Sequence, residues 1–229
     1  MSLSLLELRL YTIVPGRHGV AYERFGQCLP PLFARHGIRN IGCWTANAGP
    51  NGPMWAYLMS YESLAEREAQ WAAFYEGPQW WAIRAETQGD EEATARYDIH
   101  FLRINATLAE QALGPDHAYP TGIQDLIFAE TALGQGAAVN AFLGDTYLPA
   151  IRRAGGRPKL LADFISGPHL PRIALIIDWD NAAHRDKGWR LLRDDGPLLD
   201  AFAAQRKTRG VALMTRMDIH LLEPLIREG

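Results

Sequence analysis

The chain has 229 residues, of which 48% are hydrophobic and 21% are charged, and its formal net charge is −3. This composition is typical of a globular protein that is long enough for two compact units. The nearly balanced charge and the lack of a Lys- or Arg-rich run predict no nucleic-acid partner and no membrane surface as partner. Because no secretory leader and no apolar run of about 20 residues is present, the expected location is the cytoplasm.

The first half begins with a strand whose two faces differ. Residues 6–14 start by alternating leucines with polar or aromatic side chains, so one face is apolar and the other is not. Pro30 and Pro31 must bend or interrupt the helix that follows. Ser63 and Glu66 have the spacing of a capping box, which predicts the start of another helix. The expected elements are a strand at 6–14, a helix at 20–36, strands at 38–48 and 54–61, a helix from 63, an amphipathic segment at 80–87 and a strand at 96–102.

The closing strand of the first half is repeated near the end of the chain. Five of the seven residues at 96–102 are identical at 216–222, and Trp71 matches Trp189 at a spacing of 118 residues (189 − 71 = 118). A tandem repeat is therefore expected, because each half reads as βαββαβ. Such a unit forms a four-stranded antiparallel sheet with helices on one face, and two units can pack their open faces together. The elements expected in the second half are a strand at 126–133, a helix at 137–154, strands at 158–166 and 172–179, a helix at 181–192 and a strand at 212–222.

Several motifs of the first half resemble the NIPSNAP family. They are the Glu-Leu-Arg-Leu-Tyr run at 7–11, Arg35-His36-Gly37, Gly42-x-Trp44, the Tyr-Glu-Ser-Leu-Ala-Glu-Arg run at 61–67, Trp71-x-x-Phe74 and Gly77-Pro78-x-Trp80. The resemblance implies an α+β fold in which two tandem ferredoxin-like units pack sheet to sheet as a pseudo-dimeric α/β barrel within one chain. The expected boundaries are 1–108 for the NIPSNAP-like unit, 109–124 for a linker and 125–229 for a diverged second unit.

The second unit departs from these motifs. It lacks the Glu-Leu-Arg-x-Tyr run, and Ala154-Gly155 stands where the first unit has His36-Gly37. Any site that depends on those residues is therefore expected once in the chain. The resemblance leaves the reaction open, because NIPSNAP proteins have no defined activity and related barrels include cofactor-free monooxygenases, isomerases and haem-handling enzymes.

The candidates for catalysis are Arg9, Asp98 and His100. If strand alternation holds, Arg9 shares a face of the first strand with Glu7, while Asp98 and His100 share a face of the neighbouring closing strand. An Arg that binds a carboxylate or enolate beside a His that moves a proton is a sensible acid–base arrangement. The alternative is that these charges neutralise one another between the two halves, which the repetition of the acid and the histidine in the second half favours.

The candidates for ligand binding are Tyr11, His36, Trp44, Tyr57 and Tyr61. Those on strands either line a pocket for a flat apolar molecule or pack in the core. His36 stands at an expected helix end, where it either caps the helix or ligates haem or a metal. Since no second ligand with suitable spacing lies nearby, no metal site is expected.

These candidates lead to three functional hypotheses. The leading one is a protein that binds a small apolar or aromatic molecule in a pocket of the barrel, between the sheet and helices of the first half. It would act without a bound cofactor, as an oxygenase or isomerase. The second is a non-catalytic protein-interaction module on a rigid pseudo-dimer, and the third is haem handling through His36. The sequence leaves open whether the chain is an enzyme, and whether it is a monomeric pseudo-dimer or a homo-oligomer.

Overall fold

The computed structural model describes residues 5–89, 91–108 and 122–225. Its first half contains β1 (Leu5–Ile13), α1 (His18–Ala21), the π-helix η1 (Tyr22–Cys28), α2 (Leu29–Arg35), β2 (Arg39–Ala48), β3 (Met54–Tyr61), α3 (Leu64–Glu76), α4 (Pro78–Gln88) and β4 (Thr94–Ile104). Its second half contains β5 (Ile123–Thr131), α5 (Gly136–Phe142), the π-helix η2 (Leu143–Tyr147), α6 (Leu148–Arg153), β6 (Arg157–Phe164), β7 (Arg172–Trp179), α7 (Ala182–Arg193), α8 (Gly196–Arg209) and β8 (Met214–Pro224).

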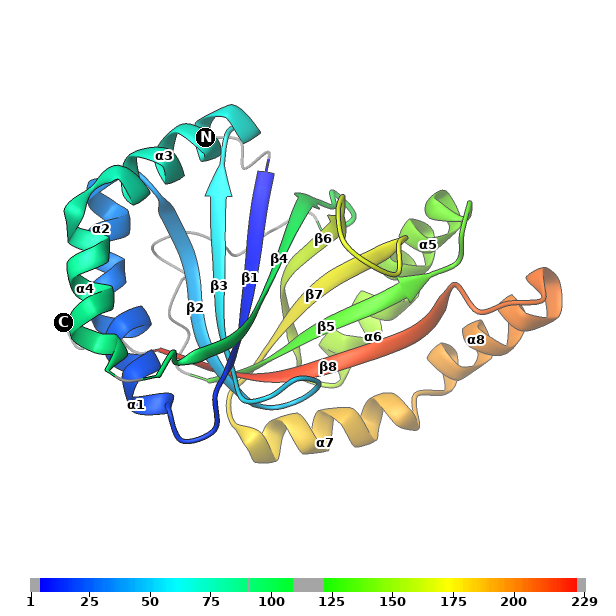
Figure 1. Cartoon of the computed structure of the whole chain (residues 1–229). Coiled ribbons are helices and arrows are strands. Elements are labelled where there is room, and N and C mark those ends of the chain that lie inside the picture. The colour runs from blue at the N-terminus through cyan, green and yellow to red at the C-terminus, as the bar shows by residue number, and fades with distance from the viewer. Residues whose placement is uncertain (1–4, 90, 109–121, 226–229) are drawn as a thin grey trace.

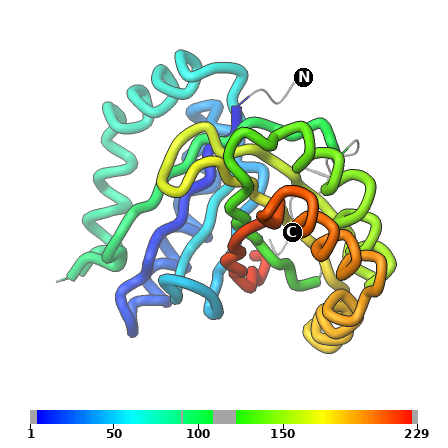
Figure 2. The backbone as a smooth tube through the Cα atoms, turned by 90° about the vertical axis from the view of Figure 1, so that its right-hand side faces the viewer, coloured from blue at the N-terminus to red at the C-terminus, as the bar shows by residue number. Residues whose placement is uncertain are grey.

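Two four-stranded antiparallel sheets form the frame of the molecule. The strand order is β4-β1-β3-β2 in the first sheet and β6-β7-β5-β8 in the second. The sheets close into one barrel because β2 pairs with β8 and β4 pairs with β6. The helices of each half cover the outer side of their own sheet, as Figure 1 and the turned view in Figure 2 show. The predicted fold of two ferredoxin-like units packed sheet to sheet is therefore confirmed.

The inside of the barrel is filled by apolar side chains from both sheets. Leu6, Leu8 and Leu10 of β1 are buried there in one cluster with Leu126 and Phe128 of β5. An eight-stranded barrel is just wide enough for side chains to fill it. This alternation turns the odd-numbered residues of β1 outward, toward the helices.

Helical segments with a π-helix in the middle replace the first helix expected in each half. At the end of η1, the backbone N–H of Leu29 donates to the carbonyl of Arg24, five residues back. Pro30 and Pro31 have no N–H to donate, and the wider π turn carries the helix into them. The second half repeats this arrangement, with η2 ahead of Pro149.

The helix expected at 181–192 is present as α7, and a helix that the sequence pattern did not predict, α8, follows it. The Asp195 side chain caps α8 by accepting a hydrogen bond from the backbone N–H of Leu198 at 2.9 Å. Pro197 lies in the first turn, where its missing N–H costs nothing, and Gly210 ends the helix in a left-handed conformation with φ of 73°. The Gly-Pro pair at 196–197 thus begins a helix.

The expected linker at 109–124 lies mostly outside the described residues, which are interrupted at 109–121. At its far end the structure places Ile123 in β5, paired with Trp179 of β7. The second sheet therefore starts two residues before the expected boundary at 125.

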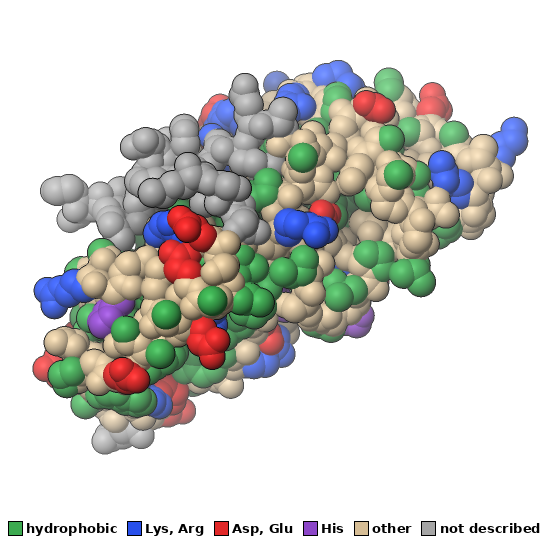
Figure 3. All heavy atoms as spheres, turned by 90° about the horizontal axis from the view of Figure 1, so that it is seen from above, with side chains coloured by type: hydrophobic (Ala, Val, Ile, Leu, Met, Phe, Trp, Pro, Cys, Tyr) green, Lys and Arg blue, Asp and Glu red, His purple; other side chains and the backbone are tan. Residues whose placement is uncertain are grey.

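The upper face of the molecule mixes acidic and basic side chains, as Figure 3 shows. Among the helices that the structure describes, none has the length and apolar character needed to cross a membrane.

His220 is a titratable group inside the packed barrel. It is 3% exposed, and its ring meets the edge of Phe128 at a centroid distance of 5.2 Å. Burial lowers the pKa of His220 to about 4, although Asp218 acts in the opposite direction. Since the unfolded chain binds this proton near pH 6.5 and the folded chain does not, lowering the pH from 6.5 toward 4 favours unfolding.

We expect His220 to reduce the free energy of unfolding by about 2 kcal/mol between pH 7.5 and pH 5. Urea unfolding of the wild type and of His220→Gln at both pH values measures this effect. The variant should lose less stability on acidification, whereas His18→Gln, at an exposed histidine, should behave as the wild type does. Equal losses in the wild type and His220→Gln would contradict the prediction.

Candidate ligand-binding site

A buried carboxylate organises the outer face of the first sheet. Glu7 of β1 is fully buried, with an exposed fraction of 0%, beneath α3. It accepts hydrogen bonds from Arg9 Nε at 2.6 Å and from Arg67 Nε at 2.8 Å. Arg67 comes from α3, so the ion pair ties that helix to the sheet. One carboxylate between two guanidinium groups leaves one positive charge unbalanced.

Arg9 is held on three sides. Its Nε donates to Glu7, its Nη1 donates to the Tyr11 hydroxyl at 2.8 Å, and its guanidinium lies 3.7 Å from the centroid of the Trp71 ring. Although burial works against the charge, Tyr11 and Glu7 raise the pKa of Arg9 above its ordinary value. Burial raises the pKa of Tyr11, against the opposing effect of Arg9. At neutral pH the site therefore holds a charged arginine beside a neutral phenol.

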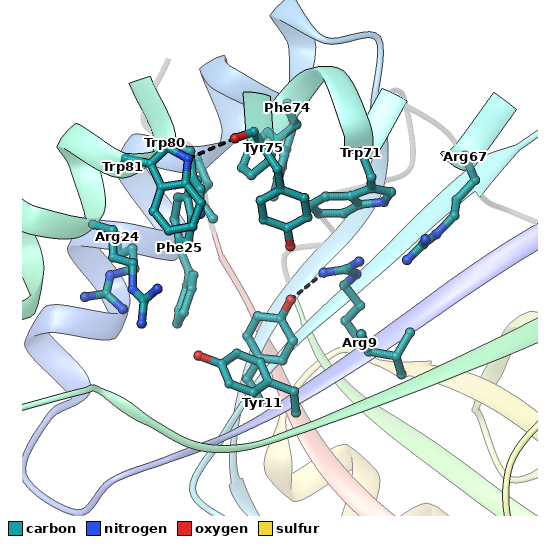
Figure 4. Close-up of a pocket in the computed structure, with 15 residues that line it drawn as sticks. Arg9, Tyr11, Arg24, Phe25, Arg67, Trp71, Phe74, Tyr75, Trp80 and Trp81 are labelled. Carbon is teal, nitrogen blue, oxygen red and sulfur yellow. Dashed lines mark hydrogen bonds between the residues drawn. The ribbon is translucent and has the colours of Figure 1, made fainter. Parts of the chain in front are cut away.

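A cavity of about 440 Å³ opens beyond this pair, between the sheet and the helices of the first half (Figure 4). Its aromatic lining consists of Tyr11, Phe25, Phe33, Trp71, Phe74, Tyr75, Trp80, Trp81 and Tyr97. Its charged lining consists of Arg9, Arg24, Arg67 and Arg84. Leu29 and Ile99 are the other lining residues, so no carboxylate of the described residues belongs to the lining.

A second ion-pair cluster lies around Arg24, at the other side of the aromatic groups in Figure 4. Arg24 Nη1 contacts Glu92 Oε1 at 2.5 Å, and Arg84 Nη2 contacts Glu92 Oε2 at 3.1 Å. Although partial burial raises the pKa of Glu92, hydrogen bonding and charge from Arg24 lower it below its ordinary value. This cluster also leaves one positive charge unbalanced.

The expectation that Arg9 and His100 share a site is wrong. In the register of β1 with β4, Arg9 lies opposite Ile99, while His100 lies opposite Leu8. His100 therefore points into the barrel with the leucines, and Arg9 points toward the helices. Asp98 lies on the same face as His100, where it pairs with Arg96 at 2.6 Å instead of Arg9.

The other expected site residues are also divided by the sheet. Tyr11 lines the cavity, whereas Trp44 lies inside the barrel and donates from Nε1 to Gln124 Oε1 at 2.6 Å. Tyr57 and Tyr61 lie on the helical side but outside the cavity lining. The Tyr57 hydroxyl donates to the carbonyl of Phe25 at 2.9 Å, and the Tyr61 hydroxyl accepts from Trp71 Nε1 at 2.9 Å. Both are core residues.

His36 follows the last residue of α2 and is partly exposed. Its ring meets the edge of Phe74 at 5.7 Å, and it does not belong to the cavity lining. Within the described residues, no group of three His, Cys, Asp or Glu side chains is placed to hold a metal ion.

Sequence reasoning missed most of the cavity. Arg67, Trp71 and Phe74 follow one stripe of α3, a spacing that is typical of core packing, yet all three also line the cavity. Arg24 could have been noticed as a charged residue beside the apolar Phe25 in the first helix. It lies in the π-helix η1, whereas the two prolines at 30–31 predict only that the helix is interrupted.

The second half has a buried acid at the corresponding position, but only one arginine contacts it. Asp125 stands 118 residues after Glu7 (125 − 7 = 118) and is also fully buried. It accepts hydrogen bonds from Arg185 Nε at 2.6 Å, Trp179 Nε1 at 2.9 Å and Trp189 Nε1 at 2.8 Å. At the same spacing from Arg9 stands an isoleucine, which is packed in the apolar core. The acid–arginine pair is therefore structural in both halves, and the additional arginine is particular to the first.

The model of the NIPSNAP family matches residues 6–107. No match was found among curated proteins. Among solved structures, the chain is similar to a proposed monooxygenase from Lactobacillus acidophilus NCFM, with a TM-score of 0.56, 10% identity and coverage of 97% of this chain and 94% of that one. A proposed monooxygenase from Fusobacterium nucleatum has a TM-score of 0.57 and 6% identity, with coverage of 98% of this chain and 94% of that one. An anthrone oxidase-like protein has a TM-score of 0.55 and 16% identity, with coverage of 98% of this chain and 92% of that one. At these identities the likeness shows a shared fold.

Replacing Glu7 by Gln removes the charge that two guanidinium groups share. We expect Glu7→Gln to lower the free energy of unfolding by about 3 kcal/mol, because it leaves Arg9 buried without a charged partner. Urea unfolding at neutral pH measures the loss. Glu68→Gln, at an exposed position of the helix that supplies Arg67, is the control and should unfold as the wild type does. A loss equal to that of the control would show that the pair contributes nothing.

Proposed function

The chain carries a NIPSNAP domain over residues 6–107, and we propose that this domain binds a small, flat aromatic molecule in its cavity. The observation that carries the proposal is the lining: nine aromatic side chains surround a space of about 440 Å³. That volume lies within the range of small-molecule pockets. Aromatic walls favour a ring system, because ring edges and faces pack against one another.

The lining also supports an orientation for the ligand. Arg9 and Tyr11 lie at the floor of the cavity, and Tyr11 accepts the hydrogen bond from Arg9, which leaves its own hydroxyl proton for a ligand oxygen. A guanidinium and a phenol side by side stabilise an oxyanion. A phenolate or enolate oxygen of the ligand would be held at this point.

The reaction class that this arrangement supports is cofactor-independent oxygenation of an aromatic ketone. A CH2 group beside the rings loses a proton to solvent water and becomes a carbanion, whose charge is delocalised onto the carbonyl oxygen at Arg9. Dioxygen then accepts the electrons: one of its atoms becomes a new carbonyl oxygen on that carbon, and the other leaves as water. The fold neighbours named as monooxygenases or as anthrone oxidase-like agree with this class.

An alternative function is a non-catalytic interaction module. It is favoured by the large side chains that remain partly exposed around the cavity, of which Trp81 is 50% and Tyr97 is 51% exposed. Apolar exposure of this kind is also found at protein interfaces. Binding of a small aromatic molecule inside the cavity distinguishes the two functions.

We expect a naphthalene probe to bind at one site per chain in isothermal titration calorimetry, with either 2-naphthoate or 2-naphthamide as the probe. Ile99 is a partly exposed residue of the lining, and Ile99→Trp should weaken binding by about tenfold because the larger ring occupies the cavity. Met217→Trp, at a comparably exposed position of β8, should leave the affinity unchanged. If neither probe binds, or Ile99→Trp has no effect, the cavity is not the site.

With anthrone as substrate, we expect the protein to consume oxygen faster than the spontaneous reaction does. Arg9→Met should reduce the rate of the protein-dependent reaction by about a hundredfold, since it removes the charge opposite the oxyanion. An oxygen electrode measures both rates. If Arg9→Met consumes oxygen at the same rate as the wild type, Arg9 takes no part in the reaction.

A further inference from the structure

We infer that the ligand of the first-half cavity is an aromatic anion whose acidic group binds at Arg24. This inference rests on the proposed function, and it adds the charge of the ligand and the point at which that charge is held. Three observations carry it: the charges around the cavity, the hydrogen bonds of Arg24, and the position of Arg24 relative to the aromatic side chains.

The charges around the cavity are unbalanced. Four arginines line it, and among the described residues neither an aspartate nor a glutamate does. Two carboxylates outside the lining partly compensate them: Glu7 is shared by two of the arginines and Glu92 by the other two. Each cluster therefore retains one positive charge. An anionic ligand would compensate this charge. A neutral ligand would displace water from the arginines and supply no negative charge in its place.

Arg24 has a donor that the described protein leaves unused. Its side chain is 1% exposed. Its Nε donates to the Thr87 hydroxyl at 2.8 Å and its Nη1 contacts Glu92, but its buried Nη2 has no partner within the described residues. Because a buried donor without a partner destabilises a protein, such a group is expected to meet water or a ligand. A carboxylate or sulfonate oxygen forms a charge-assisted bond at such a position.

Arg24 is also placed to anchor a ring system. In Figure 4 it lies at one side of the aromatic lining and Arg9 lies at the other, with Tyr75 between them. The Tyr75 carbonyl accepts a hydrogen bond from Trp81 Nε1 at 2.9 Å, which helps to hold the aromatic wall. A ligand whose acidic group contacts Arg24 would place its rings along this aromatic wall, in the direction of Arg9. The second unbalanced charge, at Arg9, then meets the far end of the ligand.

The experiment compares two probes of nearly equal shape, 2-naphthoate and the neutral 2-naphthamide, by calorimetry. The wild type should bind naphthoate at least about tenfold more tightly. Arg24→Gln should reduce the preference to about twofold or less, because naphthoate loses a charge-assisted contact and naphthamide loses at most a neutral one. The matched control is Arg35→Gln, which removes an exposed arginine of α2 outside the cavity lining and should keep the preference.

The outcomes separate the two proposals. If both probes bind the wild type equally well, the anion inference is wrong although the cavity binds aromatic molecules. If neither binds, the proposed function fails as well. A preference that survives in folded Arg24→Gln would place the acidic group elsewhere. Should circular dichroism show that Arg24→Gln is unfolded, Arg24→Lys replaces it: that variant keeps the charge but cannot make all three contacts, so an undiminished preference would overturn the inference.

Discussion

A carboxylate buried beneath a helix must be matched in charge, and this constraint organises the first half of the molecule around Glu7. Arg67 satisfies it from α3, which fixes that helix on the sheet, and Arg9 satisfies it from the strand itself. One of the two guanidinium charges is surplus, and Arg9 spreads over the face of Trp71 at the edge of a cavity. The same contacts therefore hold the fold together and place a positive charge where a ligand can reach it.

A comparison of the two halves distinguishes the contacts that the fold requires from those that occur only at the candidate site. Both keep a buried acid on their first strand and an arginine on the helix above it, so this pair belongs to the architecture. Only in the first half does a second arginine join the acid, because Asp125 is satisfied instead by Arg185 and two indole N–H groups. Differences of this kind, rather than the repeated residues, distinguish the candidate site from the architecture.

Much of the fold could be predicted because its signals are local. The hydroxyl of Ser63 accepts from the backbone N–H of Glu66 at 3.1 Å, as the capping box predicts, and the alternation along β1 separates the faces correctly. Of the residues that line the cavity, Arg9 and Tyr11 could be predicted as site residues, but the others could not, because their places depend on relations between elements. Alternation shows which residues share a face of one strand, but pairing decides that Arg9 lies opposite Ile99 and not His100. Likewise, Pro30 and Pro31 predict an interruption of the first helix, but not the π-helix in which Arg24 lies.

The proposed function and the proposed charge of the ligand require that the cavity is the ligand site and that the ligand lies in one orientation within it. A crystal structure of the protein with 2-naphthoate tests both together. We expect the naphthalene rings among the aromatic lining of the first half, with a carboxylate oxygen within hydrogen-bond distance of Arg24 Nη2. Rings bound inside the barrel or in the second half, or a carboxylate directed away from Arg24, would contradict this expectation.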